Sequence, residues 1–350
     1  MINPRMGRLV TRYSSRGTPF QVWEKPVPRI SDDFIDCCIY LYASQSDAEA
    51  GQKTGGSGFL VGVPTTKIKN GHWIYAVTNR HVIEKGNTVV RFNTVDGKTD
   101  TFDLNEQSWH FHHDGDDLAI CGLSSIDSKI YRAKFVTAQD HFITKDLVHE
   151  LNVGPGDDVF VVGRFINQEG RQCNSPSARF GNIAQMPPEP IRLSRGTGFF
   201  EQESFVVEAK SIGGYSGSPV FVGFNPLLER PERPGKATNR AYLLGVCWGY
   251  INDWTPLCDA NGEPLPSGYQ VRSNTGMMSV VPAWKLHEML YHPQWEEFRM
   301  SNEDRLLKER LEAGVPTSAS AHPATDANPT HREDFMRLVD VAGRKPEPKD

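Results

Sequence analysis

The sequence lacks long hydrophobic runs. Among its 350 residues, no segment approaches the roughly 18 consecutive apolar residues that a membrane-spanning helix needs. The first twenty residues also hold no apolar stretch of the length found in signal peptides. We therefore expect a cytoplasmic protein with no membrane partner.

The sequence also lacks an excess of positive charge. Its 38 Lys and Arg residues are outnumbered by 43 Asp and Glu residues, which gives a formal net charge of −5. Because nucleic-acid binding depends on clustered Lys and Arg side chains, the composition excludes nucleic acid as a partner class.

Cysteine is scarce and shows neither metal-binding nor disulfide spacing. No CxxC pair occurs, which argues against a zinc site built from thiolates. We expect buried free thiols in a reducing compartment. They are Cys37, Cys38, Cys121, Cys173, Cys247 and Cys258.

Other metal-ligating residue types gather at His110, His112, His113 and Asp114. Their spacing fits neither HExxH nor a facial triad carried on one element. We therefore expect no metal ion here, and no organic cofactor elsewhere in the chain.

Short runs of β-branched and aromatic residues, closed by Gly, Asn or Asp, are the dominant pattern. Such runs are typical of antiparallel strands joined by turns, and Asp96–Gly97 is a hairpin signal between two of them. Two successive groups predict an all-β fold with two tandem Greek-key β-barrels. The runs are 34–42, 59–63, 73–77, 88–92 and 118–123, with a Gly/Ser turn at 55–58, then 159–165, 179–184, 204–207, 219–224, 242–249 and 277–281.

These patterns divide the chain into three parts. We expect an extended N-terminal arm over 1–30, a domain over 31–298 and a charged, partly disordered tail over 299–350. Within the domain, the barrels are expected at about 34–130 and 150–282, followed by a closing helix at about 283–298.

We consider the tail a candidate binding segment for a protein partner. A charged helix is expected over 303–312 and a disordered linker over 316–330. Beyond them, Phe335, Leu338 and Val339 lie on one face of a short predicted helix, which would dock on a protein partner. A solvated tail without a specific role is the alternative.

The segment 213–220, GGYSGSPV, places Ser216 between glycines. A serine hydroxyl becomes a nucleophile only with a base to take its proton and donors aimed at the developing oxyanion. Glycines around Ser216 allow a tight turn that brings the N–H groups of Gly214 and Ser216 towards one point. A plain Gly/Ser turn is the competing interpretation.

Two further segments supply a candidate base and acid. The run WIYAVTNRHVI brings His81 to the end of an apolar strand, where an imidazole can be held rigidly. In DDLAIC, Asp117 opens another apolar strand and can orient an imidazole, while Asp116 is expected to face solvent.

In their residues, chain order and strand context, these three segments resemble the trypsin-like serine proteases of the chymotrypsin superfamily, the PA clan. The resemblance covers about 34–298. It implies a serine endopeptidase that cleaves protein or peptide substrates through a covalent acyl-enzyme. It also implies Ser216 as nucleophile, His81 as general base, Asp117 as its orienting acid, and the N–H groups of Gly214 and Ser216 as oxyanion donors.

The same resemblance extends to substrate binding. LLGVCWGY, 243–250, resembles the strand that pairs with the substrate backbone and walls the primary specificity pocket, which implies that Trp248 and Gly249 line the cleft. Lys210 precedes Ser216 by six residues, at the position of the pocket floor, and would favour an acidic residue before the scissile bond. A surface lysine, or one neutralised by Glu208, is the alternative.

Within the superfamily, the chain resembles bacterial proteases of the high-temperature-requirement type more than digestive enzymes, but shows no PDZ domain. Tyr215 stands where digestive enzymes have the aspartate that pairs with a freed N-terminus, so that activation route is not expected.

Two other function classes compete with this interpretation. An α/β-hydrolase is disfavoured because the strands do not alternate with helices and the segment is not G-x-S-x-G. A catalytically silent protease-like module for binding or scaffolding remains the alternative to an enzyme.

Overall fold

The chain divides into two units, Met1–Asp32 and Asp33–Asp350. The computed structural model describes residues 8–13, 19–24, 30–123, 126–165, 170–187, 189–195, 198–209, 214–223 and 241–312. In the first unit, β1 (Arg8–Tyr13) and β2 (Pro19–Glu24) pair as an antiparallel hairpin inside the stretch expected as an extended arm.

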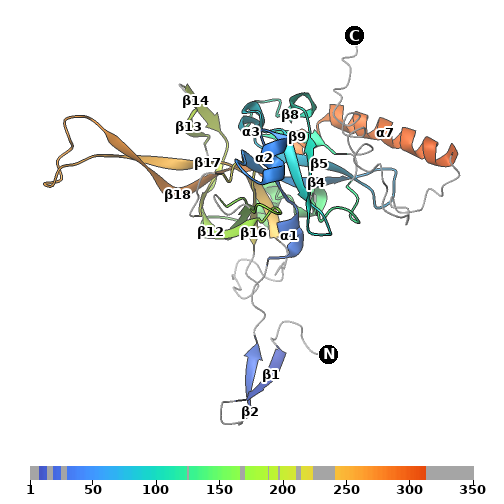
Figure 1. Cartoon of the computed structure of the whole chain (residues 1–350), viewed down its shortest axis with the longest axis horizontal. Helices are drawn as coiled ribbons and strands as arrows, with labels where there is room; N and C mark the ends of the chain where they lie inside the picture. The colour runs from blue at the N-terminus through green and yellow to red at the C-terminus, as the bar shows by residue number, and fades with distance from the viewer. Residues whose placement is uncertain are drawn as a thin grey trace. The chain divides into compact units, whose positions relative to one another are not determined.

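The first strand group of the second unit forms one sheet in the order β7-β6-β3-β4-β5-β9-β8, with β10 paired to β4 (Figure 1). Because β3, β4 and β5 follow one another as antiparallel neighbours and β6 returns beside β3, the topology is a Greek key. The strands are β3 (Cys38–Tyr42), β4 (Gly56–Pro64), β5 (His72–Thr78), β6 (Val89–Asn93), β7 (Thr99–Asp103), β8 (His110–Phe111), β9 (Ala119–Gly122) and β10 (Val136–Thr137).

Short helices lie between these strands. One of them, α1, corrects a sequence-based expectation. The run 34–42 is not all strand, because Phe34 belongs to α1, where its ring packs against Phe160 and Phe221 of the second strand group. The helices are α1 (Asp32–Asp36), α2 (Gln45–Ala50), α3 (Arg80–Glu84) and the 3-10 turn η1 (Glu106–Ser108).

The expected Gly/Ser turn at 55–58 is also wrong, because β4 already begins at Gly56. The glycines are there because neighbouring residues approach the backbone of β4 too closely to leave room for a side chain. A Cβ added at Gly58 would lie 2.7 Å from the carbonyl oxygen of Val77, and one at Gly56 would lie 2.8 Å from Val82 Cγ1. Glycine is therefore required within this strand by its neighbours and not by a turn.

The second strand group closes into a barrel in the order β11-β12-β15-β18-β17-β16. Here β16 returns beside β11, next to the consecutive β11, β12 and β15, which makes a second Greek key. A separate hairpin, β13–β14, is inserted after β12. The strands are β11 (Asp158–Gly163), β12 (Ser177–Gln185), β13 (Ile191–Arg195), β14 (Gly198–Gln202), β15 (Phe205–Glu208), β16 (Pro219–Gly223), β17 (Ala241–Pro256) and β18 (Gln270–Pro282).

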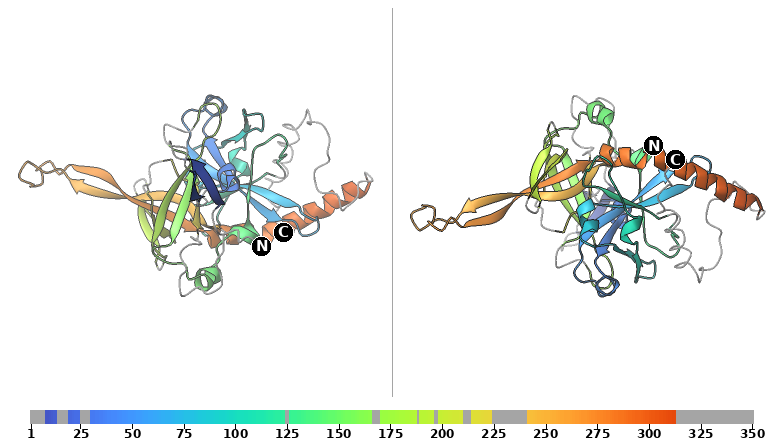
Figure 2. Two further views of the ribbon diagram at one scale, coloured as in Figure 1. Left: turned by 90° about the horizontal axis from the view of Figure 1, so that it is seen from below. Right: turned by 90° about the horizontal axis from the view of Figure 1, so that it is seen from above.

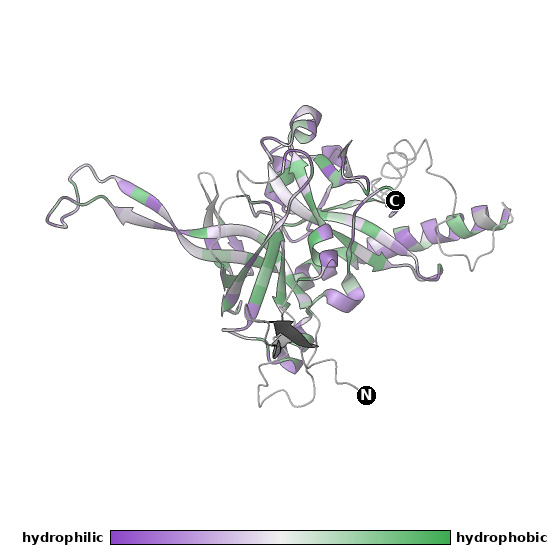
Figure 3. Cartoon of the chain, turned by 60° about the horizontal axis from the view of Figure 1, so that its bottom comes forward, coloured by the Kyte–Doolittle hydropathy of each residue, from purple (hydrophilic) through white to green (hydrophobic). Residues whose placement is uncertain are grey.

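The predicted all-β fold is therefore present, with its hydrophobic residues concentrated on the barrel strands (Figure 3). The Asp96–Gly97 hairpin is also present, since Thr94 and Lys98 close a turn between β6 and β7. Helices α4 (Ala138–His141) and α5 (Lys145–Glu150) lie between the two strand groups along the chain.

Two helices follow the second barrel. They are α6 (Ala283–Leu290) and α7 (Pro293–Glu312), so the helix expected at 283–298 is interrupted at Tyr291–His292 and continues to Glu312. Proline is well suited to the first position of a helix, where its missing N–H is not needed. The expected charged helix over 303–312 is the second half of α7, which carries mostly hydrophilic residues (Figure 3).

A buried carboxylate attaches α7 to the first strand group. Glu303, only 1% exposed, accepts hydrogen bonds from the backbone N–H groups of Thr66 and Lys67 and from the indole N–H of Trp73. Arg299, also buried, donates to the hydroxyl of Tyr75. The later tail segments, 316–330 and the predicted helix at Phe335, Leu338 and Val339, lie outside the described residues.

All six cysteines are free thiols. Four of them are buried, but Cys173 is half-buried and Cys258 is exposed, so the expectation of burial is wrong for the last. Over the described ranges, no helix is long and apolar enough to cross a membrane.

Candidate active site

His81 lies in the first turn of α3, three residues after the end of β5. Its side chain is mostly buried, with 17% exposed. The ring nitrogen Nδ1 lies 2.6 Å from Oδ2 of Asp117, a hydrogen bond that requires the proton to lie between the two atoms. Nδ1 therefore carries the hydrogen in the neutral ring, and Nε2 keeps the lone pair that can accept a proton.

Asp117 immediately precedes Leu118 and β9, and is 1% exposed. Its second oxygen, Oδ1, accepts the backbone N–H of His81 at 2.9 Å, so one carboxylate binds the same histidine at two points. The backbone of Asp117 is held as well, because its carbonyl oxygen accepts from the side-chain amide of Asn79 at 2.8 Å. The imidazole and the carboxylate are thus mutually fixed.

Gln202, at the end of β14, is a residue of this site that the sequence did not reveal. It is 1% exposed, and its side-chain oxygen accepts the backbone N–H of Asp117 at 2.8 Å. Its amide nitrogen donates to Asp116 Oδ1 at 2.7 Å. Asp116 therefore does not face solvent as expected, but is half-buried and also lies 3.5 Å from the ammonium of Lys285. Gln202 thus links both neighbouring aspartates to the β13–β14 hairpin.

The loop of Ser216 enters from the second barrel, between β15 and β16. Gly214 and Gly217 have φ values of +101° and +85°, which non-glycine residues rarely adopt. Tyr215 is buried, and its hydroxyl lies 2.7 Å from Ser177 Oγ on β12. The tyrosine therefore anchors the loop from beneath, while Ser216 remains half-buried at the surface of the site.

Contacts of the first strand group place this loop beside His81. The carbonyl oxygen of Ser216 accepts the N–H of Ser57 at 2.9 Å. A Cβ added at Gly56 would touch both Val82, next to His81, and the Ser216 carbonyl oxygen. Among the described residues, Ser216 Oγ makes no hydrogen bond with His81. The structure thus brings the elements that carry His81, Asp117 and Ser216 together.

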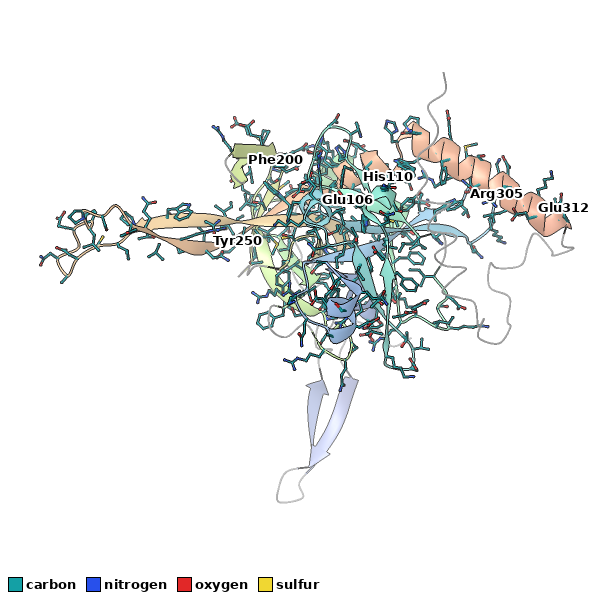
Figure 4. The ribbon with its side chains drawn as sticks, turned by 45° about the horizontal axis from the view of Figure 1, so that its top comes forward. Glu106, His110, Phe200, Tyr250, Arg305 and Glu312 are labelled. Atoms are coloured by element: carbon teal, nitrogen blue, oxygen red, sulfur yellow. The ribbon has the colours of Figure 1, made fainter. Side chains whose placement is uncertain are left out.

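The oxyanion donors named from the sequence are the N–H groups of Gly214 and Ser216. Within the described ranges, neither N–H has a hydrogen-bond acceptor, so both remain available to a substrate oxygen. Trp248 is buried, with its indole N–H donating to Ser204 Oγ at 2.9 Å and its ring packed edge-on against Phe200 of β14. Figure 4 labels Phe200 on this strand.

Gly249 follows Trp248 on β17, opposite Ser279 of β18. Lys210 lies outside the described residues, as does Gly213. An acidic preference before the scissile bond therefore stays a prediction.

The histidines near β8 do not assemble a ligand set in the part of the chain that is described. His112 is buried and stacks on His113, with ring centroids 4.6 Å apart. Burial lowers the pKa of His112, more than the nearby carboxylate of Asp116 raises it. His110 packs edge-on against Trp295 of α7, which is a packing role.

Two consecutive Greek keys, with a His–Asp pair on the first and a glycine-flanked serine loop on the second, define the class of trypsin-like peptidases. Residues 56–223 match the family described as trypsin-like peptidase domain. The matched segment extends from β4 to β16 and spans both strand groups, and its fold is trypsin-like. The finer likeness to proteases of the high-temperature-requirement type stays a prediction.

No curated protein matches the chain in sequence. Among solved structures, the chain is similar to Rv3671c protease from M. tuberculosis in its active form, with 16% identity, a TM-score of 0.38, and coverage of 74% of this chain and 81% of that chain. It is also similar to human heparin binding protein, with 10% identity, a TM-score of 0.40, and coverage of 75% and 93%. At these TM-scores the two likenesses carry no weight in the assignment.

The Ser216 loop can be tested at Gly217. A Cβ there would lie 2.0 Å from the Ser57 carbonyl oxygen and 2.3 Å from Thr78 Oγ1. We expect Gly217→Ala to displace the loop and to lower peptide hydrolysis about a hundredfold or more. Gly97→Ala is the matched control, since Gly97 has a similar φ of +82° with no atom within 4 Å. Equal activity in the two variants would contradict this role of Gly217.

Gln202 can be tested by Gln202→Leu, which removes its hydrogen bonds to Asp116 and Asp117. We expect kcat for peptide hydrolysis to fall about tenfold while KM changes little, because Asp117 loses support and no substrate contact is removed. Gln185→Leu, at an exposed position of β12, is the control and should retain full kcat. A loss confined to KM, or no loss, would show that Gln202 does not position the pair.

Proposed function

We propose that the protein is a serine endopeptidase that hydrolyses peptide bonds of protein substrates through Ser216, His81 and Asp117. The observation that carries the proposal is the pair of hydrogen bonds from His81 to the buried Asp117 carboxylate, next to the Ser216 loop. Burying a charged carboxylate costs free energy unless hydrogen bonds compensate it. The carboxylate of Asp117 is compensated by the two N–H groups of His81, which fix the orientation of the imidazole.

The reaction follows from the roles of these atoms. Nε2 of His81 takes the Ser216 proton as Oγ attacks the scissile carbonyl carbon, and Asp117 stabilises the imidazolium that forms. The N–H groups of Gly214 and Ser216 bind the carbonyl oxygen as it becomes an oxyanion. The imidazolium then protonates the leaving amine, which breaks the peptide bond and leaves an acyl ester on Ser216.

Water completes the cycle. His81 takes a proton from a water molecule that attacks the ester, and the second oxyanion collapses as His81 returns the proton to Ser216 Oγ. The products are the new carboxylic acid and the free enzyme. No step in this sequence calls on a metal ion or an organic cofactor.

Cysteine does not compete with Ser216 for the role of nucleophile. Cys247 lies beside the loop, since its carbonyl oxygen accepts the N–H of Gly217 at 2.8 Å. Burial raises the pKa of the Cys247 thiol to about 12, so it stays protonated and unreactive near neutral pH. Burial likewise raises the pKa of Cys121.

A catalytically silent protease-like module is the second candidate. What favours an enzyme is that each predicted catalytic residue type is present and that His81 is oriented with Nε2 unbonded among the described residues. In a binding scaffold, nothing would require the Asp117 carboxylate, which is 1% exposed, to use both oxygens to orient the His81 imidazole.

The proposal predicts the behaviour of two variants. We expect Ser216→Ala and His81→Ala each to lower kcat for a peptide substrate about a thousandfold or more, because each removes a group that takes part in bond making. The rate is measured on a library of quenched fluorescent peptides.

The matched controls are Ser46→Ala and His113→Ala, both at exposed positions, and these should keep the wild-type rate. Wild-type turnover in either Ser216→Ala or His81→Ala would overturn the assignment. Absence of turnover in folded wild-type protein would favour the silent module.

A further inference from the structure

Two barrel strands continue far beyond the barrel. Within the barrel, β17 lies between β16 and β18, and β18 lies between β15 and β17. Pairing with β16 ends at Val246 and pairing with β15 ends at Met277, whereas β17 and β18 stay paired out to Pro256 and Gln270. We call residues 250–276 the outer ribbon, which stands clear of the barrel in every view (Figures 1 and 2).

The outer ribbon exposes large apolar side chains. In the described part of the chain, nine such side chains are exposed, and five of them belong to these 27 residues, a concentration that scattered surface exposure does not produce. A two-stranded ribbon of this kind is also only marginally stable in water by itself. Both facts indicate that another chain covers it. The five are Trp254, Leu257, Leu265, Tyr269 and Val271.

The apolar groups lie on both faces of the ribbon. Trp254 is opposite Arg272, whose guanidinium lies 5.4 Å over the ring of Tyr250 and donates to its hydroxyl at 3.2 Å. The pairing and the ring contact place these three side chains on one face. Figure 4 labels Tyr250 on the ribbon. Leu257 and Tyr269 are paired through a backbone hydrogen bond of 2.9 Å nearer the tip.

The tip itself is ordered by a carboxylate. Asp259 accepts the backbone N–H groups of Asn261 at 2.8 Å and Glu263 at 3.0 Å. The hydrogen bonds from Glu263 and Asn261 hold the pKa of Asp259 below its usual range. A ribbon that is already shaped loses less entropy when it binds a partner strand.

The free edge of β17 shows which partner fits. Along this edge, β17 pairs with β16 as far as Val246. At the next residue, the carbonyl oxygen of Cys247 accepts the N–H of Gly217, and the N–H of Cys247 donates to the carbonyl oxygen of Ser218 in the Ser216 loop. From Trp248 to Pro256, the edge has no strand partner within the described ranges. An extended peptide held at Ser216 and running along β17 therefore continues directly onto the outer ribbon. At about 3.3 Å per residue, the open edge accommodates an extended segment of about eight residues.

We propose that the outer ribbon binds the part of a protein substrate that precedes the scissile bond, as an added β-strand with apolar side chains at alternate positions. This inference rests on the proposed peptidase function, and it adds a substrate class, extended apolar segments, to that function. Backbone pairing along the edge gives affinity, while side chains next to Tyr250 and Trp254 select apolar residues. The three acidic residues of the ribbon, against one arginine, disfavour acidic segments.

The test measures binding to the Ser216→Ala protein, in which no cleavage interferes. Fluorescence anisotropy gives Kd for a short labelled peptide and for the same peptide with eight alternating Val and Thr residues added upstream of the scissile bond. We expect the extension to tighten Kd at least tenfold. An equally long Gly/Ser extension should tighten it less than twofold.

Two altered ribbons show whether this gain belongs to the proposed surface. In one, an Asn-Gly turn replaces residues 254–272 and joins the cross-strand partners Asp253 and Ser273. In the other, Trp254→Ser and Tyr269→Ser are combined, which keeps the ribbon and removes apolar area. The gain should be lost in both, and it should be kept in Val95→Ser, where an exposed apolar residue of the first strand group is changed.

An equal gain with shortened and intact ribbons would overturn the inference, as would no gain in the intact protein. A dimer in light scattering that dissociates when the ribbon is shortened, together with no gain, would assign the ribbon to self-association instead. Turnover by the wild-type protein is measured separately. Its absence contradicts the proposed function, while the binding series still decides the role of the ribbon.

Discussion

One carboxylate holds His81 at two points, and the arrangement of the site depends on this contact. Asp117 accepts the ring N–H of His81 at 2.6 Å and its backbone N–H at 2.9 Å, from a position that is 1% exposed. A charge so deeply buried is costly unless hydrogen bonds satisfy it, so the surrounding structure must keep the donors in place. Both donors belong to His81 of α3, three residues after the end of β5, and the acceptor lies two residues before the start of β9.

The β13–β14 hairpin, which is inserted between strands of the second group, contributes to the same contact from the other side. Gln202 accepts the backbone N–H of Asp117 and ties it to Asp116, which in turn lies near Lys285 of α6. The Ser216 loop is fixed independently, through Tyr215 below it and Ser57 beside it. The base and the nucleophile are therefore placed by different elements, and they meet only because the two strand groups pack together.

The strands of both groups could be predicted from the sequence because buried strands are short apolar runs closed by turn residues. The His81 and Asp117 segments were visible for the same reason, since each lies at the end of such a run. Gln202 could not be found in this way. It is a single polar residue, 85 positions from Asp117, and only the folded chain brings the two together. Glu303 was missed likewise, because its partners lie about 230 residues away on the first strand group.

The outer ribbon was invisible for the opposite reason. The strand run was expected to end at 249, because the residues beyond it are polar and turn-forming and pack against no core. Pairing between β17 and β18 extends the strands regardless, since backbone hydrogen bonds need no apolar pattern. The residues of the outer ribbon show no strand periodicity. Its few apolar side chains are isolated in the sequence, and they are exposed.

The central claim is that Ser216 is an activated nucleophile. The most direct measurement is covalent labelling of the folded protein with a fluorophosphonate, followed by mass spectrometry to locate the modified residue. We expect one phosphonyl group per chain, located on Ser216, with labelling strongly slowed in Asp117→Asn. Folded wild-type protein that stays unlabelled, or that carries the label at another residue, would contradict it.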